Sequence, residues 1–252
     1  MIELKTVEEI KIMKAGGKIL AKTLREVAKI AQEGVTLDEL DRLAEKTIRE
    51  AGATPAFLGY QPTGANEAYP ASICASVNEV VVHGVPSQRT LRQGDIVKID
   101  CGVLHKGYYT DSAITVPIGE ISPEVKKLLE ATKKALELAI NECRVGKTIG
   151  DIGYVIVDQA RKHDLKPLKG LTGHGIGKEL HQEPTIYNEG EKGTGLSLQE
   201  GMVLAIEPMF SVGSDEIRQL ADESYATKDD SLSSHFEHTV AITRLGPEVL
   251  TK

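Results

Sequence analysis

The stretch IVKIDCGVLHKGYYTDSAITV, residues 96–116, decides how the chain is organised, because it carries two apolar strands around one short turn. With residues 105 and 106 in the turn, it is predicted to form a β-hairpin with a two-residue turn, in which Asp100 lies directly opposite Asp111. Their Cβ atoms would be about 5 Å apart, and like charges so placed destabilise a sheet. The pair therefore indicates either two solvated carboxylates on an exposed face or a cation bound between them.

The composition is that of a globular protein and argues against several other classes. The 252 residues suffice for one large domain or two small ones, and the net charge of −7 offers no basic surface for DNA or an anionic membrane. The start lacks the apolar run of a signal peptide, and no stretch approaches the roughly 18 apolar residues of a transmembrane helix. The three cysteines form no C-x-x-C pair, which argues against a disulfide framework and fits a reducing cytoplasm.

Four amphipathic helices are predicted from apolar residues that recur at helical spacing. They begin behind the caps Thr6, Thr36, Ser122 and Thr148, and glycines end the first three near residues 34, 52 and 146. The pair Gly16 and Gly17 weakens the first helix unless another segment packs closely there. The apolar faces of all four helices are expected to cover the core.

Aromatic and histidine residues mark the segment before the hairpin. An irregular stretch rich in Gly and Pro holds Phe57, Tyr60 and Tyr69, which either anchor this loop or line a pocket. The strand region ASICASVNEVVVHGVP follows, with Cys74 inside it and His83 near its end. A lone histidine there is by itself no sign of a site.

A weak internal repeat relates the two halves of the chain. At an offset of 112 residues Gly34, Thr36 and Pro55 recur as Gly146, Thr148 and Pro167, and at an offset of 107 Gly94, Ile99 and Asp100 recur as Gly201, Ile206 and Glu207. We therefore expect one catalytic domain, residues 1–252, built from two pseudo-symmetric halves of about residues 1–120 and 121–252. Each half would supply one carboxylate hairpin. The second would pair Glu207 with Glu237, its turn lengthened by an acidic insertion.

The two hairpins and a Gly-rich segment would bring acidic and histidine side chains to one centre. These residues are Asp100, Asp111, Glu207 and Glu237 from the hairpins, and His174 and His181 from the segment KGLTGHGIGKELHQEP. Four carboxylates do not gather in a dry cleft without cations, because desolvation and repulsion would be too costly. Two divalent ions balance them, and such ligands suit Mn, Fe, Co or Zn without selecting among them. Two ions bridged by a water suit hydrolysis of an acyl bond, with a nearby glutamate as general base.

The set VVHGVP, GDIVKIDCGVLHKGYYTDSA, GHGIGKELHQEP, GMVLAIEP and FEHTVAIT resembles type I methionine aminopeptidases over nearly the whole chain. The resemblance implies the α+β "pita-bread" fold, a curved and mostly antiparallel sheet covered by helices, in two pseudo-symmetric halves. It also implies five metal ligands, which are Asp100, Asp111, His174, Glu207 and Glu237. By this resemblance Asp111 and Glu237 bridge both metals, Asp100 completes one ion, and His174 and Glu207 complete the other.

The resemblance also implies the substrate and the residues that contact it. The substrate would be the initiator methionine of a new polypeptide, removed when the next residue is small. His83 would meet the scissile amide, His181 the substrate carbonyl, and Glu207 would be the acid and base. The methionine pocket would include Tyr69 and Cys74, with Phe57 and Tyr60 near. A monomer in the cytoplasm, in transient contact with the ribosome, is the implied setting.

Three features of the sequence differ from the usual family pattern, and two rival functions remain open. Tyr60 and Tyr69 are nine positions apart, which is longer than usual, the DESYAT region has no Trp, and Leu180 stands where Phe is more usual. A prolidase-like peptidase would share the metal set but usually carries an extra N-terminal domain. A non-catalytic binding module on this fold would have lost ligands. The G-x-S-x-G and H-E-x-x-H motifs of other hydrolases are absent.

Overall fold

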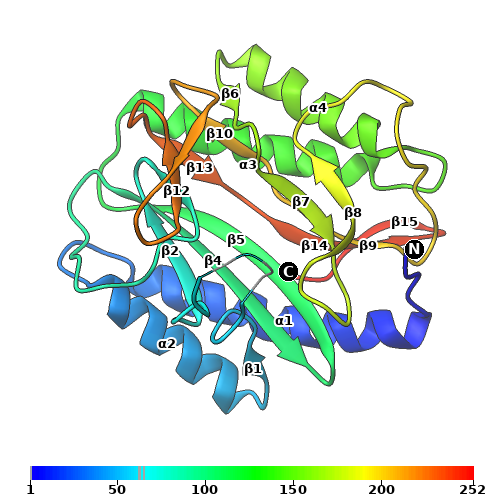
Figure 1. The fold of residues 1–252 in the computed structure, drawn as a ribbon, viewed down its shortest axis with the longest axis horizontal. Coiled ribbons are helices and arrows are strands. Elements are labelled where there is room, and N and C mark those ends of the chain that lie inside the picture. Colours follow the sequence, from blue (N-terminus) through cyan, green and yellow to red (C-terminus); the bar gives the residue numbers. More distant parts are fainter. Residues whose placement is uncertain (1, 62–63, 65) are drawn as a thin grey trace.

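Two pairs of helices flank a layer of strands (Figure 1). Helices α1 (Val7–Ile30) and α2 (Leu37–Glu50) form the blue pair below the strands, and α3 (Pro123–Glu142) and α4 (Ile149–Lys162) form the green pair above them. This is a computed structural model, and it describes residues 2–61, 64 and 66–252. The four predicted helices are confirmed, and within the described residues none is long and apolar enough to cross a bilayer.

Side-chain caps fix where each helix begins. Capping boxes join Thr6 with Glu9, Thr36 with Glu39 and Thr148 with Asp151, and Ser122 caps the helix that has Pro123 in its first turn. In each box the threonine hydroxyl accepts a backbone N–H while the acid accepts the N–H of the threonine, so two unpaired donors are satisfied. Such a cap contributes about 1 kcal/mol. The predicted starts are therefore confirmed at the level of single hydrogen bonds.

Within the described part of the chain the strands form four antiparallel sheets. The first sheet holds β1 (Thr54–Pro55), β4 (Ile96–His105), β2 (Ile73–Val77) and β5 (Tyr108–Pro117). The largest holds, in order, β15 (Gly246–Val249), β14 (His238–Thr243), β9 (Val203–Ile206), β7 (Thr172–Gly175) and β8 (Gln182–Tyr187). Two smaller sheets run β13 (Ser233–His235), β10 (Met209–Ser211), β6 (Lys166–Pro167), and β11 (Ile217–Gln219), β12 (Tyr225–Thr227), β3 (Val80–Val82).

The hairpin of β4 and β5 forms as predicted, but its register differs. Asp100 pairs with Ala113 and not with Asp111, because the turn is made by Lys106 and Gly107. Both turn residues have positive φ, 50° and 83°, as a tight hairpin turn requires, and glycine adopts this conformation without strain. The prediction with residues 105 and 106 in the turn was therefore wrong. The register shift is two residues, so Asp100 and Asp111 still lie on the same face of the hairpin.

The internal repeat reappears in the backbone hydrogen bonds. Isolated bridges join Thr36 with Thr90 and Thr148 with Ser197, and equivalent bonds run from Gly34 to Leu91 and from Gly146 to Leu198. Short strands β1 and β6 pair at matching positions, since the N–H of Ala56 donates to Gly102 and the N–H of Leu168 donates to Met209. These pairs keep the offsets of 112 and 107 residues seen in the sequence. Both parts of the chain therefore build the same local structure.

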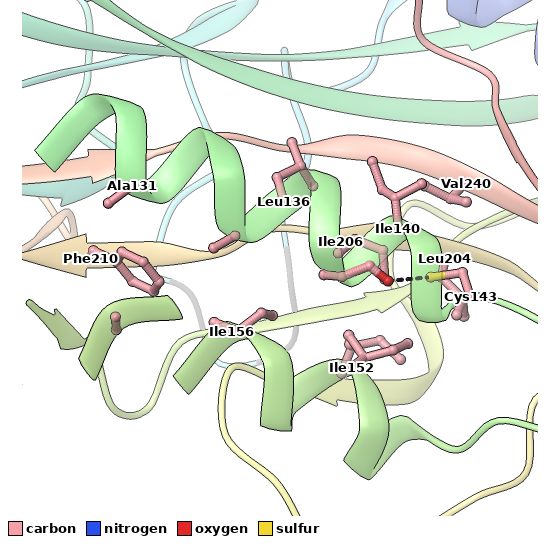
Figure 2. Packing of buried hydrophobic residues seen from close by; sticks show 14 of the residues in the cluster. Ala131, Leu136, Ile140, Cys143, Ile152, Ile156, Leu204, Ile206, Phe210 and Val240 are labelled. Atoms are coloured by element: carbon pink, nitrogen blue, oxygen red, sulfur yellow. Dashed lines mark hydrogen bonds between the residues drawn. The ribbon is translucent and has the colours of Figure 1, made fainter. Parts of the chain in front are cut away.

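Two apolar cores, one under each helix pair, hold the strands in place. Figure 2 shows the core under α3 and α4, where Ile140, Ile152 and Ile156 pack toward Leu204 and Ile206 of strand β9. A matching core under α1 and α2 is formed with β2 and β4. Fully burying such a side chain stabilises the fold by about 1.5–3 kcal/mol. The strands that carry the acidic residues are therefore fixed from behind by both cores.

Helix α1 has a close contact that explains its central glycine pair. A Cβ at Gly17 would lie 2.1 Å from the carbonyl oxygen of Leu250, so the C-terminal segment crosses the helix there. Gly17→Ala is expected to destabilise the protein by about 2 kcal/mol, since a gain of about 1 kcal/mol in helix propensity does not offset a backbone clash. Urea denaturation followed by circular dichroism measures this. In the control Gly16→Ala the Cβ would meet no backbone atom, only the Cβ of His105 at 3.2 Å and Oγ1 of Thr110 at 3.6 Å. An equal loss there would contradict the explanation.

Candidate metal centre

One cleft collects all the site residues predicted from the sequence. It has a volume of about 1730 Å³, and its lining comes from strands of both halves of the chain, among them β4, β5 and β7. Its lining includes Phe57, Tyr60, Tyr69, Cys74, His83, Asp100, Asp111, His174, His181, Glu207 and Glu237. Residues from both halves of the chain therefore face one space.

The four carboxylates come from two hairpins that meet at their centres. Asp100 and Asp111 lie on one face of β4 and β5, because Asp100 pairs with Ala113, two residues from Asp111. In the other hairpin β9 and β14 pair up to Ile206 opposite His238. Glu207 and Glu237 are the next residues along each strand. They occupy the gap before the pairing resumes between β10 and β13.

Hydrogen bonds lock the two hairpins together beside these carboxylates. The Thr239 hydroxyl donates to the carbonyl of Asp111 at 2.7 Å and accepts the N–H of Asp111 at 2.9 Å. The N–H of Glu237 donates to the carbonyl of Ala113 at 2.9 Å. Residues on different halves are thus held in fixed positions relative to one another, as a multi-ligand site requires.

His174 completes a group of possible metal ligands. Ligand atoms of Asp111, His174 and Glu237 all lie within 4.8 Å of one another. The Nδ1–H of His174 donates to the carbonyl of Gly175 at 2.9 Å, so Nε2 keeps a free lone pair. The Nε2 atom of His174 lies 3.7 Å from Oε1 of Glu207. Two electron-rich atoms facing each other at this distance are favourable only with a cation or a proton between them.

The electrostatics of the centre call for bound cations. Burial raises the pKa of Asp100 to about 6, and burial raises the pKa of Asp111, Glu207 and Glu237 well above the usual range. Oδ1 of Asp100 and Oε1 of Glu237 are buried without a hydrogen-bond partner among the residues that the structure describes. Buried, unpaired acceptors are costly, and cations would satisfy them. An oxygen-rich set with one imidazole fits divalent ions such as Mn, Fe, Co or Zn.

Two further histidines stand beside this centre. Nδ1 of His181 is 2.8 Å from the hydroxyl of Tyr60, and its ring lies edge-on to His174 with the centroids 4.5 Å apart. His83 packs edge-on against Tyr225, with a centroid distance of 5.9 Å. Burial lowers the pKa of His181 to about 4 and also lowers that of His83. Both rings are therefore neutral near pH 7, and each can donate one hydrogen bond to a ligand in the cleft.

The predicted side-chain pocket lies next to the carboxylates. Phe57 and Tyr69 meet edge to face with centroids 6.5 Å apart, and the Tyr69 hydroxyl donates to the carbonyl of Gly84 at 2.9 Å. Cys74 is the neighbour of Asp100 across β2 and β4, so its buried thiol lies close to the metal centre. These side chains form an apolar wall beside the charged one, as a pocket for an uncharged side chain requires.

Comparison with known proteins identifies the family. Residues 11–244 match metallopeptidase family M24. The chain belongs to this family. The methionine aminopeptidase of Aquifex aeolicus is 45% identical over 257 residues, which cover 100% of this chain and 99% of that protein. The crystal structure of the methionine aminopeptidase of Thermotoga maritima is 39% identical, with a TM-score of 0.96 and full coverage of both chains.

The M24 family also contains more distant relatives that bear on the prolidase alternative. The prolidase of Pyrococcus furiosus is 25% identical with a TM-score of 0.78, and the match covers 99% of this chain but 65% of the prolidase. The higher identity and full mutual coverage favour the methionine aminopeptidases as relatives. These neighbours confirm the pita-bread fold of this M24 chain.

Two parts of the M24 site were not found from the sequence. His235 is fully buried, and its Nε2 lies 3.5 Å from Oε2 of Glu207. The sequence signal was available, because His235 stands two residues before Glu237 and strand side chains alternate. The loop from Gln219 to Glu223 also lines the cleft, through the acidic insertion. The resemblance had singled out the DESYAT region around Glu223, but no signal placed residues 219–221 at the cleft, because their position depends on the distant pairing of β12 with β3.

Proposed function

We propose that this protein removes the N-terminal methionine from polypeptides whose second residue is small. The observation that carries the proposal is the set of four carboxylates, two buried and two half-buried, that lie with His174 in one cleft of an M24 chain. Curated relatives of that chain are methionine aminopeptidases. An apolar pocket beside the charged centre is consistent with a methionine side chain.

The proposed ligands are the five residues that surround the cleft centre. Asp111 and Glu237 would be shared by two divalent ions, Asp100 would complete one site, and His174 with Glu207 would complete the other. Divalent ions bound there would supply Lewis acidity and lower the pKa of a water. The free amine of the substrate would have to reach this centre, which restricts the enzyme to the chain end.

The protein's own groups would orient the peptide and move protons. The Glu207 carboxylate, with its raised pKa, is suited to take a proton from water and pass it to the leaving amine. Neutral His181 would donate to the carbonyl of the first peptide bond, with its other nitrogen held by the Tyr60 hydroxyl. His83 would contact the amide that is cleaved. The buried walls around Cys74 and Tyr69 would exclude water from the methionine side chain.

His181→Ala is expected to lower kcat by about 10²-fold while the metal content stays unchanged. The reason is that His181 would stabilise charge on the carbonyl oxygen without being a metal ligand. Steady-state kinetics combined with metal analysis of the purified variant measures both quantities. Loss of metal from this variant would contradict the assignment, as would an unchanged kcat.

The cellular setting is also part of the proposal. We propose one catalytic domain of two halves, residues 1–120 and 121–252, which acts as a monomer in the cytoplasm. Its partners would be new polypeptides and, transiently, the ribosome, with no DNA or membrane partner. The net charge of −7 and the repeat of backbone bonds at two offsets support these expectations.

The deciding experiment is release of free methionine from a Met-Ala-Ser peptide by metal-stripped protein that is titrated with Mn, Co, Fe and Zn. Acetylated Met-Ala-Ser, Leu-Ala-Ser and Met-Leu-Ser peptides serve as matched controls. Activity that returns with metal, only for free Met followed by Ala, supports the proposal in full. Cleavage of the Leu-Ala-Ser peptide would overturn the pocket, and cleavage of Met-Leu-Ser the small-residue preference. Metal binding without any cleavage would favour the binding-module alternative.

A further inference from the structure

The His235 imidazole has no role in the site described so far, although it faces that site. It is 1% exposed, and neither ring nitrogen has a hydrogen-bond partner among the described residues. A buried polar ring without partners is costly, so such a group calls for an explanation. Its Nε2 lies 3.5 Å from Oε2 of Glu207.

Glu207 lies between two imidazoles, and they differ in whether the nitrogen that faces Glu207 carries a lone pair or a hydrogen. Oε1 faces Nε2 of His174, which carries a lone pair because Nδ1–H of that ring is bound to Gly175. Oε2 faces Nε2 of His235, which has no such constraint. Only a donor faces a carboxylate oxygen favourably, so the His235 nitrogen on this side is the one that carries hydrogen. Oε2 therefore faces a donor that lies just outside hydrogen-bond contact, and Oε1 is left for a cation.

The backbone holds the His235 ring in this direction. The backbone N–H of His235 donates to Oγ1 of Thr115 at 3.0 Å, and the Thr115 hydroxyl donates to the backbone carbonyl of His235 at 2.7 Å. On the other side His235 pairs with Met209 of β10, two residues beyond Glu207. The ring and the carboxylate thus stand on neighbouring strands of one fixed register, and small movements of either would bring them into hydrogen-bond contact.

We propose that His235 is a positioning residue for Glu207: its Nε2–H holds Oε2, so that Oε1 and the His174 nitrogen converge on one metal ion. This proposal depends on the proposed function only for the identity of the reaction, because measurements of metal binding test the role of His235 directly. Donors behind a metal ligand fix the orientation of that ligand, and their loss costs about 10–100-fold in metal affinity or activity.

Two amide variants test the proposal, because the side-chain nitrogen of Gln reaches about as far as Nε2 of histidine and that of Asn only as far as Nδ1. His235→Gln is expected to keep Co²⁺ affinity and kcat within about threefold of the unmodified protein. His235→Asn is expected to lose about 10–100-fold in both, with KM changed less, and to alter the visible spectrum of bound Co²⁺. Titration calorimetry, absorption spectroscopy and kinetics on Met-Ala-Ser measure these quantities.

Thr132→Val is the matched control, because the Thr132 hydroxyl forms a hydrogen bond with the hydroxyl of Ser234, which is the neighbour of His235 on β13. It is expected to lower thermal stability while leaving Co²⁺ affinity and spectrum unchanged. The proposal is overturned if Asn and Gln behave alike, or if Thr132→Val reproduces the loss of Co²⁺ affinity. If the unmodified protein releases no methionine but the Co²⁺ results are as expected, the proposed function fails and the role of His235 stands.

Discussion

Asp111→Asn is expected to lower kcat/KM for a methionyl peptide by at least about 10³-fold, which corresponds to about 4 kcal/mol of transition-state stabilisation. The carboxylate of Asp111 is 4% exposed and lies within 4.8 Å of ligand atoms of His174 and Glu237. An amide in its place cannot neutralise a cation and leaves the position without its charge. Steady-state kinetics and metal analysis of the variant measure the loss of activity and of both ions.

The same substitution should have the opposite effect on the metal-free protein. Removing one of four crowded carboxyl groups relieves the cost of burying them, so metal-stripped Asp111→Asn should be at least as stable as the metal-stripped parent. Asp95→Asn is the control, because Asp95 is also buried but accepts bonds from Asn78 and Arg92 away from the centre. It should lower stability and leave metal content intact. Full metal content and activity in Asp111→Asn would contradict the assignment.

Metal affinity is expected to weaken steeply as the pH falls, by at least about 10²-fold between pH 7 and pH 5. In the metal-free protein burial raises the pKa of Asp100 to about 6, and burial also raises the pKa values of Asp111, Glu207 and Glu237 well above the usual range. Raised pKa values mean that protons occupy these groups before the metal does. Each proton displaced makes affinity fall about tenfold per pH unit below the pKa of that group. His174 adds no competition, since burial lowers its pKa to about 3.

Calorimetric titration with Mn²⁺ in buffers of different ionisation enthalpy counts the protons released at pH 6. The parent protein should release more than one proton per molecule that becomes fully loaded. The variant Asp100→Asn should release fewer, because the amide cannot hold a proton that must leave. An affinity that is independent of pH between 5 and 7 would show that these carboxyl groups are already ionised without metal, contrary to the burial argument.

Features set by short-range chemistry were predicted correctly from the sequence. The helices begin at Thr6, Thr36, Ser122 and Thr148 because each cap satisfies its own backbone donors within one turn. The repeat identified the second carboxylate hairpin because the same local bonds are formed twice along the chain. Strand alternation brought Asp100 and Asp111 to one face even though the assumed register was wrong.

Features set by contacts between distant strands were not predicted. The turn was misplaced because residue 105 was taken as the partner of Lys106 in place of Gly107, and both registers keep the same side chains on each face, so strand alternation did not separate them. His235 was not identified from the sequence, because its position beside Glu207 depends on how the strands pair. The part of the cleft around Glu223 depends on β12 joining β3, a strand far away in the sequence. In each case the missing information was the position of a partner in space.

Residues 212–232 form a segment that can change in length without moving the strands that carry Glu207 and Glu237. The segment begins after Ser211 and ends before Ser233, and these two serines pair directly with each other. The pairing of β9 with β14 continues in the same register. Insertions or deletions inside the segment therefore leave Glu207 and Glu237 in place. Its Gln219–Glu223 tip and Tyr225 nevertheless line the cleft. A lineage carrying this scaffold can thus diversify what it recognises by remodelling one loop, while the machinery for bond cleavage is inherited unchanged.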